Sequence, residues 1–283
     1  MTPASRRRPI GGWAGRAALI VTAAIPLAFL AIFFVVPVAG MIGRGVLVDG
    51  QLDLGGFTEV FSRSRTARVI AFTLGMSAAA TVITILVGLP TAYTLYRLRM
   101  PFARAVRSLV MMPFVMPTVV VGVMFRSLLA PGGFLGWLGL DGSWVAILAA
   151  FVFFNLAVVV RTVGGAWEAL GPRTQQSAAA LGASPWVVCR TVTFPALAPA
   201  VVSAASVVFL FCSTAFGVVL TLGGMRYGTV ETEIYLLTTT LLDLRGAAAL
   251  SVVQLLAVGA MLWVSGRART RAEGAADGRG SWG

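Results

Sequence analysis

The stretch WVAILAAFVFFNLAVVVRTVG, residues 144–164, decides the fold class. It contains a single charged residue, Arg161, and it matches the roughly 20 apolar residues that a helix needs to cross a bilayer. Five further runs of this kind occupy residues 17–42, 69–96, 106–129, 196–222 and 247–265. The sequence therefore predicts an all-α polytopic membrane protein with six transmembrane helices.

The composition excludes an ordinary soluble domain. Hydrophobic residues make up 58% of the chain, charged residues 11%, and the mean hydropathy is +0.90, whereas soluble domains carry about 25% charged residues. The first run is too long for the apolar core of a cleaved signal peptide, so we expect an uncleaved first helix. The predicted organisation is a basic N-terminal tail (1–16), a six-helix domain (17–266) and a disordered C-terminal tail (267–283).

All basic residues are Arg, and they flank the apolar runs. One side of the predicted membrane carries fifteen: Arg6, 7, 8, 16, 97, 99, 104, 107, 161, 173, 190, 267, 269, 271 and 279. The other carries seven: Arg44, 63, 65, 68, 126, 226 and 245. Because positive residues collect on the cytoplasmic side, we expect both termini in the cytoplasm, in a cell (plasma or inner) membrane. Arginines placed in this way indicate contact with lipid headgroups and exclude nucleic acid as a partner.

Several chemistries are excluded by missing residue types. The chain has no Lys and no His. We expect its two cysteines, Cys189 and Cys212, to pack as small apolar side chains. A Walker A phosphate loop needs its Lys, so any ATP and Mg²⁺ must be bound by a partner chain. Without a metal-ligand cluster, a His base or a nucleophile motif, we expect no cofactor, no metal and no enzymatic activity on this chain.

The longest predicted cytoplasmic segment reads GPRTQQSAAALGASPWVVCRTVTFP, residues 171–195. Its outline is helix, turn, helix: Gly182 suits the left-handed conformation that ends a helix. Ser184 and Pro185 suit the N-cap and first position of the next helix. We expect Phe194–Pro195 to break that second helix before the fifth membrane helix.

This segment resembles the EAA loop of ATP-binding-cassette (ABC) importer permeases, with Gln176-Ser177-Ala178 at the Glu-Ala-Ala positions and Gly182 at the Gly. The resemblance implies that a short helix seats in a groove of a separate ATPase subunit. The residues it assigns to this coupling are Gln176, Ser177, Ala178, Ala179, Gly182, Ala183, Ser184 and Pro185. Gln176 replaces the usual Glu, which removes a charge that could pair with the ATPase.

A second resemblance, to the thiamine and ferric-iron permeases, covers roughly residues 61–265. It is carried by residues 151–156, Arg161, Glu168, the loop 171–195 and residues 211–224 and 229–236. It implies the type I ABC importer permease fold, with a small solute of thiamine or ferric-iron type. The implied partners are ABC ATPase subunits, an extracytoplasmic solute-binding protein and a second permease unit. A second unit is expected because one six-helix unit supplies half of a two-fold pathway.

Polar residues in the apolar runs are the candidate pathway residues: Asn155, Ser206, Ser213, Thr214, Gly223 and Gly224. Hydroxyls on the second run, Thr73, Ser77, Thr81 and Thr84, are weaker candidates, because such groups often bond their own backbone. Gly223 and Gly224 predict the outer end of the fifth helix. Residues 229–240 predict a short interfacial helix whose Glu231 and Glu233 are solvated or face a binding protein; this acidic pair weakly favours a cationic solute.

The main alternative is a secondary transporter driven by an ion gradient. Such transporters place Asp, Glu or His inside the bilayer, and none of the six runs contains one. The sequence therefore favours the importer.

Overall fold

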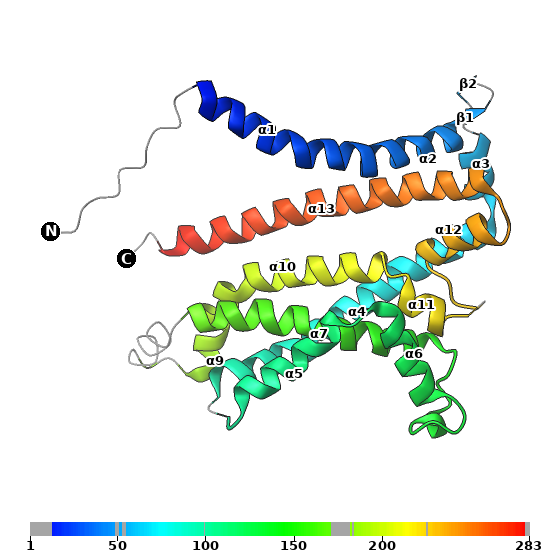
Figure 1. The fold of residues 1–283 in the computed structure, drawn as a ribbon. Helices are drawn as coiled ribbons and strands as arrows, with labels where there is room; N and C mark the ends of the chain where they lie inside the picture. Colours follow the sequence, from blue (N-terminus) through cyan, green and yellow to red (C-terminus); the bar gives the residue numbers. More distant parts are fainter. Residues whose placement is uncertain are drawn as a thin grey trace.

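The computed structural model describes residues 13–48, 51–52, 55–98, 100–170, 182, 184–224 and 226–280 (Figure 1). The first half of the chain forms α1 (Trp13–Leu30), the π-turn η1 (Ala31–Val35), α2 (Val36–Val46), strands β1 (Leu47–Val48) and β2 (Gln51–Leu52), α3 (Gly55–Ser62), α4 (Ser64–Arg97), α5 (Ala103–Val115) and α6 (Thr118–Leu129). The second half forms η2 (Gly136–Leu138), α7 (Trp144–Ala169), α9 (Pro185–Val188), η3 (Cys189–Thr193), α10 (Phe194–Ser213), α11 (Gly217–Leu222), α12 (Val230–Thr239) and α13 (Leu244–Gly280).

Six spans result from these elements. Five helices are long and apolar enough to cross a membrane: Leu19–Met41, Ser64–Arg97, Trp144–Ala169, Pro185–Ser213 and Leu244–Ala268. The sixth span is the bent pair α5 and α6. The prediction of an all-α, six-span protein is confirmed, and β1 and β2 add only a small antiparallel hairpin.

The core lies where α4, α7 and α10 pack on one another. Its centre consists of small and β-branched side chains such as Ala80, Ala150 and Val159, which let the helices approach closely. Gly88 of α4 is part of this contact, because a Cβ there would lie 2.5 Å from Val159 Cγ1. A second cluster joins α3, the start of α4, α12 and α13.

Helices α1 and α2 lie at the edge of the bundle, alongside α13 (Figure 1). None of the apolar window of this first span is buried inside the protein. An apolar helix with so little protein contact has the surface expected for lipid or for another membrane chain.

The run 106–129 is not one helix, as the sequence predicted, but two helices that meet at an angle of 103°. The bend lies at Met116 and Pro117. Met116 has the extended backbone (φ −75°, ψ 142°) that a following proline imposes, and Pro117 has no N–H to continue the helix.

The run 196–222 is also divided, because α10 ends at Ser213 and α11 begins at Gly217. The predicted break at Phe194–Pro195, in contrast, is wrong. The π-turn η3 leads directly into α10, with Pro195 in its first turn. A π-turn is a known way to insert a residue without ending the helix, and the proline lies where a helix N-terminus tolerates it.

The last helix runs further than predicted. The sequence places a disordered tail from residue 267, whereas α13 continues to Gly280. Ala and Arg have high helix propensity, and no proline interrupts this segment.

Candidate solute pathway and coupling segment

The two helix breaks lie against each other, because α11 packs on α6. Two glycines make this contact possible. A Cβ on Gly217 would lie 2.6 Å from Thr118 Oγ1 and 2.8 Å from the Val119 backbone nitrogen. A Cβ on Gly122 would collide with Thr221 Oγ1. The breaks therefore form one structural unit, which joins the bend inside the α5–α6 pair to the end of the Pro185–Ser213 span. Interrupted helices at membrane depth are tolerated only beside a cavity or inside protein.

A cavity of about 360 Å³ lies at these breaks, and we call it the central cavity. Its lining residues come from both sides of the two breaks and from α7: Phe114, Thr118, Phe151, Phe154, Asn155, Phe211, Thr214, Ala215, Phe216, Gly217 and Val218. Two of the predicted pathway residues, Asn155 and Thr214, are among them. The cavity combines aromatic walls with a few polar groups, as small-molecule sites do.

Asn155 is the most unusual polar group of the central cavity. Its side chain is 2% exposed. Its Nδ2 donates to the Phe151 carbonyl at 2.9 Å and lies 3.4 Å from Cys212 Sγ. Its Oδ1 has no hydrogen-bond partner among the described residues. A buried acceptor without a partner costs about 1–3 kcal/mol, so a functional reason for it is expected.

A second, larger cavity of about 720 Å³ lies on the side of the break towards the predicted cytoplasm, and we call it the inner cavity. Phe114 and Phe211 line both cavities, with their ring centroids 5.8 Å apart. Phe154 lies 5.6 Å from Phe114. These three rings therefore stand between the central and the inner cavity.

Two arginines line the inner cavity. Arg107 is held in place: its guanidinium donates to the Leu95 carbonyl at 2.6 and 3.0 Å and lies over the Tyr96 ring at 3.8 Å. Arg161 of α7 has no hydrogen bond or ion pair with any described residue. A charged side chain within a membrane helix that faces a cavity is a functional candidate by default.

The other predicted pathway residues are not among the lining residues of the central or the inner cavity. Ser206 and Ser213 donate to the carbonyls of Val202 and Leu210. Gly223 would collide with the Tyr227 carbonyl if it carried a Cβ, and Gly224 has a φ of +54°. These two glycines end α11, whereas the fifth membrane helix, which the sequence predicted to end here, already ends at Ser213. The α4 hydroxyls donate to carbonyls four residues earlier in the same helix, as expected for hydroxyls that bond their own backbone. These are the hydroxyls of Thr73, Ser77, Thr81 and Thr84.

The predicted short helix is confirmed as α12, which Thr229 and Thr232 begin with a capping box. Its two carboxylates differ in burial. Glu233 is 5% exposed and accepts from Arg65 Nε at 2.7 and 2.9 Å. Glu231 is partly buried beside Gln254 Nε2 at 3.3 Å, and burial raises its pKa. The interpretation as a solvated acidic pair is wrong for Glu233, which is buried in an ion pair, whereas Glu231 keeps part of its surface in contact with solvent.

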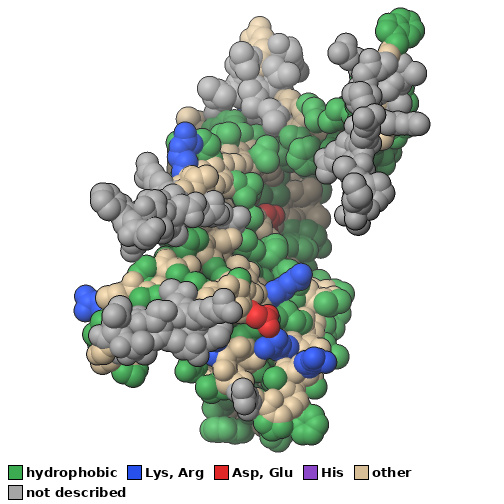
Figure 2. All heavy atoms as spheres, turned by 90° about the vertical axis from the view of Figure 1, so that its left-hand side faces the viewer, with side chains coloured by type: hydrophobic (Ala, Val, Ile, Leu, Met, Phe, Trp, Pro, Cys, Tyr) green, Lys and Arg blue, Asp and Glu red, His purple; other side chains and the backbone are tan. Residues whose placement is uncertain are grey.

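The described part of the coupling segment has the predicted local structure. Gly182 has a φ of +83°. Ser184 accepts from the Val187 N–H as N-cap, and Pro185 takes the first helical turn. Gln176, Ser177, Ala178, Ala179 and Ala183 lie outside the described residues. Figure 2 views the end of the molecule that carries α9 and shows several Arg side chains there with little acidic surface.

Residues 84–269 match the family model of the binding-protein-dependent transport system inner membrane component. The chain belongs to this family. The match covers the central cavity, the inner cavity and the coupling segment, so the features described above lie in the family's own domain.

Curated relatives of this permease serve different solutes. The molybdenum transport system permease protein ModB of Mycobacterium tuberculosis is 33% identical, over 80% of this chain and 88% of its own length. The sulfate transport system permease protein CysT of Escherichia coli is 27% identical, over 83% and 86%. The thiamine transport system permease protein ThiP of Salmonella typhimurium is 28% identical over 93% of this chain but 49% of its own length.

Solved structures place this permease in the type I ABC importer fold. The permease of a bacterial ABC transporter for import of the acidic polysaccharide alginate superposes with a TM-score of 0.76, at 17% identity, over 90% of this chain and 96% of that chain. The MetNI methionine ABC transporter gives a TM-score of 0.59, at 18% identity, over 73% and 95%. At these identities the likeness concerns the fold alone.

Two features of the permease site escape prediction from the sequence. The arginine distribution assigns Arg161 to the cytoplasmic side as a topology signal, although its place inside an apolar run is a sign of a cavity. Phe114 is one aromatic among many in the sequence, and only the Met116–Pro117 pair that follows it closely marks the break.

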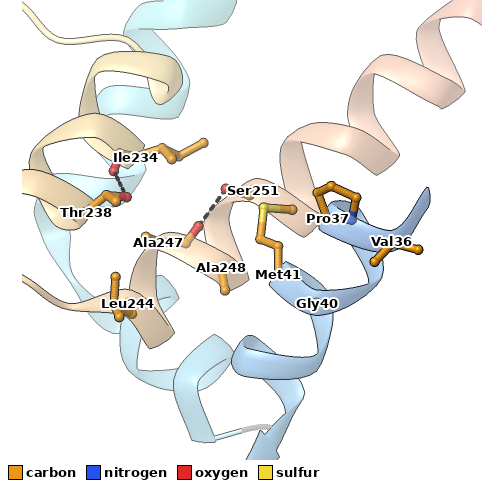
Figure 3. Close-up of a pocket in the computed structure, with 10 residues that line it drawn as sticks. All are labelled: Val36, Pro37, Gly40, Met41, Ile234, Thr238, Leu244, Ala247, Ala248 and Ser251. Carbon is orange, nitrogen blue, oxygen red and sulfur yellow. Dashed lines mark hydrogen bonds between the residues drawn. The ribbon is translucent and has the colours of Figure 1, made fainter. Parts of the chain in front are cut away.

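A groove between α2, α12 and α13 has no charged side chain among its described lining residues. Its volume is about 520 Å³, and Figure 3 shows Pro37, Met41 and Ile234 among the mostly apolar side chains that face it. The hydrogen bonds drawn there, from Thr238 and Ser251, go to carbonyls of their own helices. The mostly apolar lining of this groove suits lipid or another apolar surface.

Proposed function

We propose that this permease is one half of an importer that carries a small inorganic oxyanion, such as molybdate or sulfate, into the cytoplasm. The observation that carries the proposal is the inner cavity, where Arg161 and Arg107 are the charged lining residues. No carboxylate is among the described residues that line the central or the inner cavity. Arg107 lies 3.9 Å from Glu168 Oε1, so the unpaired Arg161 supplies the net positive charge, which attracts anions and repels cations.

The pathway runs from the central cavity, past Phe114, Phe154 and Phe211, to the inner cavity. Asn155 and Thr214 contact the solute in the central cavity, and Arg161 receives it below the aromatic rings. An unpaired guanidinium suits this task, because its planar donors match an oxyanion bidentately.

The permease works with partners. A separate ABC ATPase binds ATP and Mg²⁺ and acts through residues 171–195, a second permease unit completes the pathway, and an extracytoplasmic binding protein delivers the solute. Both termini face the cytoplasm, as the arginine distribution indicates. The left-handed Gly182 and the capped α9 support the coupling role, because they hold the turn of an EAA-type loop.

A solute of thiamine or ferric-iron type is the second candidate. The relation to thiamine permeases spans more of this chain, 93%, than the relation to ModB does. Thiamine is a cation, however, and so is ferric iron unless it is chelated. The arginines of the inner cavity repel both cations, and neither Glu231 nor Glu233 lines the central or the inner cavity.

Uptake of radiolabelled molybdate, sulfate, thiamine and ferric iron, measured in cells that depend on this system, tests the solute class. We expect oxyanion uptake, and Arg161→Gln should lower its kcat/KM about tenfold, the effect of losing one charge-assisted hydrogen bond. Arg104→Gln is the matched control, because Arg104 is exposed on α5 and does not line the cavity; it should change uptake less than about twofold. Thiamine uptake that Arg161→Gln leaves intact would refute the proposal.

The coupling role has its own test. Gly182→Asp should abolish ATPase association and uptake, because Asp is strained at this backbone angle and adds a charge to the contact. Gly132→Asp is the control: Gly132 has a φ of +90° and, like Gly182, has open space where a Cβ would stand, but it lies in the loop after α6. Co-purification of the ATPase is measured for both. If both variants lose it equally, the effect is general misfolding and not coupling.

A further inference from the structure

A third cavity, of about 280 Å³, lies at the end of the molecule opposite α9, between the start of α4 and residues 226–228. We call it the outer arginine pocket. Its lining contains three arginines, Arg65, Arg68 and Arg226, beside Val69, Phe72, Tyr227 and Gly228. We propose that this pocket binds the oxyanion solute on the outer side before it enters the central cavity. The inference rests on the proposed function, whose solute class it shares.

The charge of the pocket is not balanced by the protein. Arg65 is paired, because Glu233 accepts from its Nε. Among the described residues, Arg68 donates a hydrogen bond only to the Ser64 carbonyl, at 3.4 Å, and the guanidinium of Arg226 lies 5.5 Å from the Tyr227 ring centroid. Neither takes part in any ion pair of the described residues. Three positive groups therefore face one carboxylate, and an anion between Arg68 and Arg226 would relieve their mutual repulsion.

The walls of the pocket suit a small, strongly charged ligand. Phe72 and Tyr227 stack with their centroids 5.6 Å apart. The three arginines are themselves exposed, so a solute arriving from the outer side can reach them, and their attraction for it falls with increasing salt. Guanidinium groups from two sides offer several N–H donors, and a tetrahedral oxyanion has acceptors in all directions.

The pocket is tied to the helix break that forms the central cavity. The Tyr227 N–H donates to the Gly223 carbonyl at the end of α11. The Val230 N–H donates to Thr73 Oγ1 of α4 at 3.0 Å, and Thr229 Oγ1 donates to the Ala215 carbonyl at 3.3 Å. Residues 226–230 therefore connect α4 with both ends of α11. An anion held here lies beside the segment that is hydrogen-bonded to both ends of α11, and Ala215 at one of those ends lines the central cavity.

Binding of radiolabelled molybdate, and separately sulfate, to the permease co-purified with its ATPase in phosphatidylcholine nanodiscs tests the pocket. Arg68→Gln and Arg226→Gln should each weaken binding about tenfold. Arg226→Lys, which keeps the charge without the planar fork, should weaken it less than Arg226→Gln. The control is Arg126→Gln, because Arg126 is exposed at the same end and contacts only the Thr221 carbonyl, at 3.4 Å; it should bind as the wild type does.

Three outcomes would overturn the inference. In the first, Arg68→Gln and Arg226→Gln bind the oxyanions as Arg126→Gln does. In the second, nanodiscs with phosphatidylglycerol block molybdate binding to the wild type and the two variants lose that lipid instead, so that a headgroup is the ligand. In the third, the variants lose anion-free association with the binding protein and keep anion binding, so that an acidic protein surface is the partner.

Uptake separates this inference from the proposed function. In one outcome the wild type imports an oxyanion and Arg161→Gln impairs this uptake, but Arg68→Gln and Arg226→Gln change neither uptake nor binding. The proposal for the outer arginine pocket is then wrong, while the proposed function stands. If the wild type imports thiamine and binds no oxyanion, the solute class is wrong, and the pocket fails with it.

Discussion

Helices α4 and α10 carry similar polar side chains, but only α10 ends at the central cavity. Thr73, Ser77 and Thr84 of α4 bond their own backbone, and so do Ser213 and Thr214 at the end of α10. Helix α4 continues for 34 residues, even through Pro90. Helix α10 ends shortly before α11 begins, and its last turn faces Asn155 and the α5–α6 bend.

The difference teaches that hydroxyls do not mark a solute path in a membrane helix. Their hydrogen bonds are local in both helices. What separates the two is the interruption, which leaves room beside a buried amide and brings Gly217 against Thr118. In this permease α4 is the scaffold, and the broken helices form the path.

The largest expected effect comes from closing the contact between the breaks. Gly217→Ala places a Cβ 2.8 Å from the Val119 backbone nitrogen, which no side-chain movement can relieve. We expect uptake at background level and a lower yield of folded protein, by uptake assay and size-exclusion chromatography. Gly75→Ala of α4 is the control: nothing lies within 4 Å of its Cβ, and Ala is the better helix former by about 1 kcal/mol. Equal activity of the two variants would remove the distinction between scaffold and path.

A smaller effect, without loss of stability, is expected at the cavity amide. Asn155→Leu removes the unpartnered Oδ1, so the protein should be as stable as the wild type or more stable, while uptake falls about tenfold or more because a polar contact is lost. Thr84→Val is the counterpart on α4. It removes the hydrogen bond to the Ala80 carbonyl, should cost about 1 kcal/mol, and should leave uptake unchanged. Thermal unfolding and uptake are measured for both variants. A loss of uptake that is larger for Thr84→Val than for Asn155→Leu would contradict the assignment of α4 as scaffold.

The smallest effect is expected at Glu231, which shares a hydrogen-bonding partner, Gln254, with the last residue of α10. Gln254 Nε2 lies 3.3 Å from both the Ser213 carbonyl and Glu231 Oε1. Burial raises the pKa of Glu231, so its ionised form opposes folding above that pKa, and the opposition ends as the pH falls through it. Glu231→Gln should therefore raise the unfolding temperature slightly at neutral pH, with the gain vanishing in acid and uptake unchanged. A gain that grows as the pH falls would show that another group is responsible.

Features that depend on local rules could be predicted from the sequence. Gly182, Ser184 and Pro185 have the predicted conformations because a left-handed glycine and an N-cap depend only on neighbouring residues. The number of spans follows from hydropathy. The Met116–Pro117 bend is also local, but a hydropathy run does not register a change of direction.

Other features depend on contacts between distant residues. Glu233 and Arg65 are 168 positions apart, and nothing in either segment indicates that they pair. Asn155 could be singled out because it is the one amide in its apolar run. Its unpartnered oxygen, and the second break beside it, depend on how α7 packs against α10 and α5.

The central claim, that the solute passes through the helix breaks, is tested most directly by thiol labelling. In a background with Cys189→Ser and Cys212→Ala, the variants Thr118→Cys and Thr214→Cys are compared with Ser77→Cys and Thr84→Cys in the assembled transporter. A small membrane-impermeant methanethiosulfonate should label the first pair, with protection by transported solute, and leave the second pair unlabelled. Labelling of Ser77→Cys and Thr84→Cys, with Thr118→Cys and Thr214→Cys inert, would place the path along α4 and contradict the account.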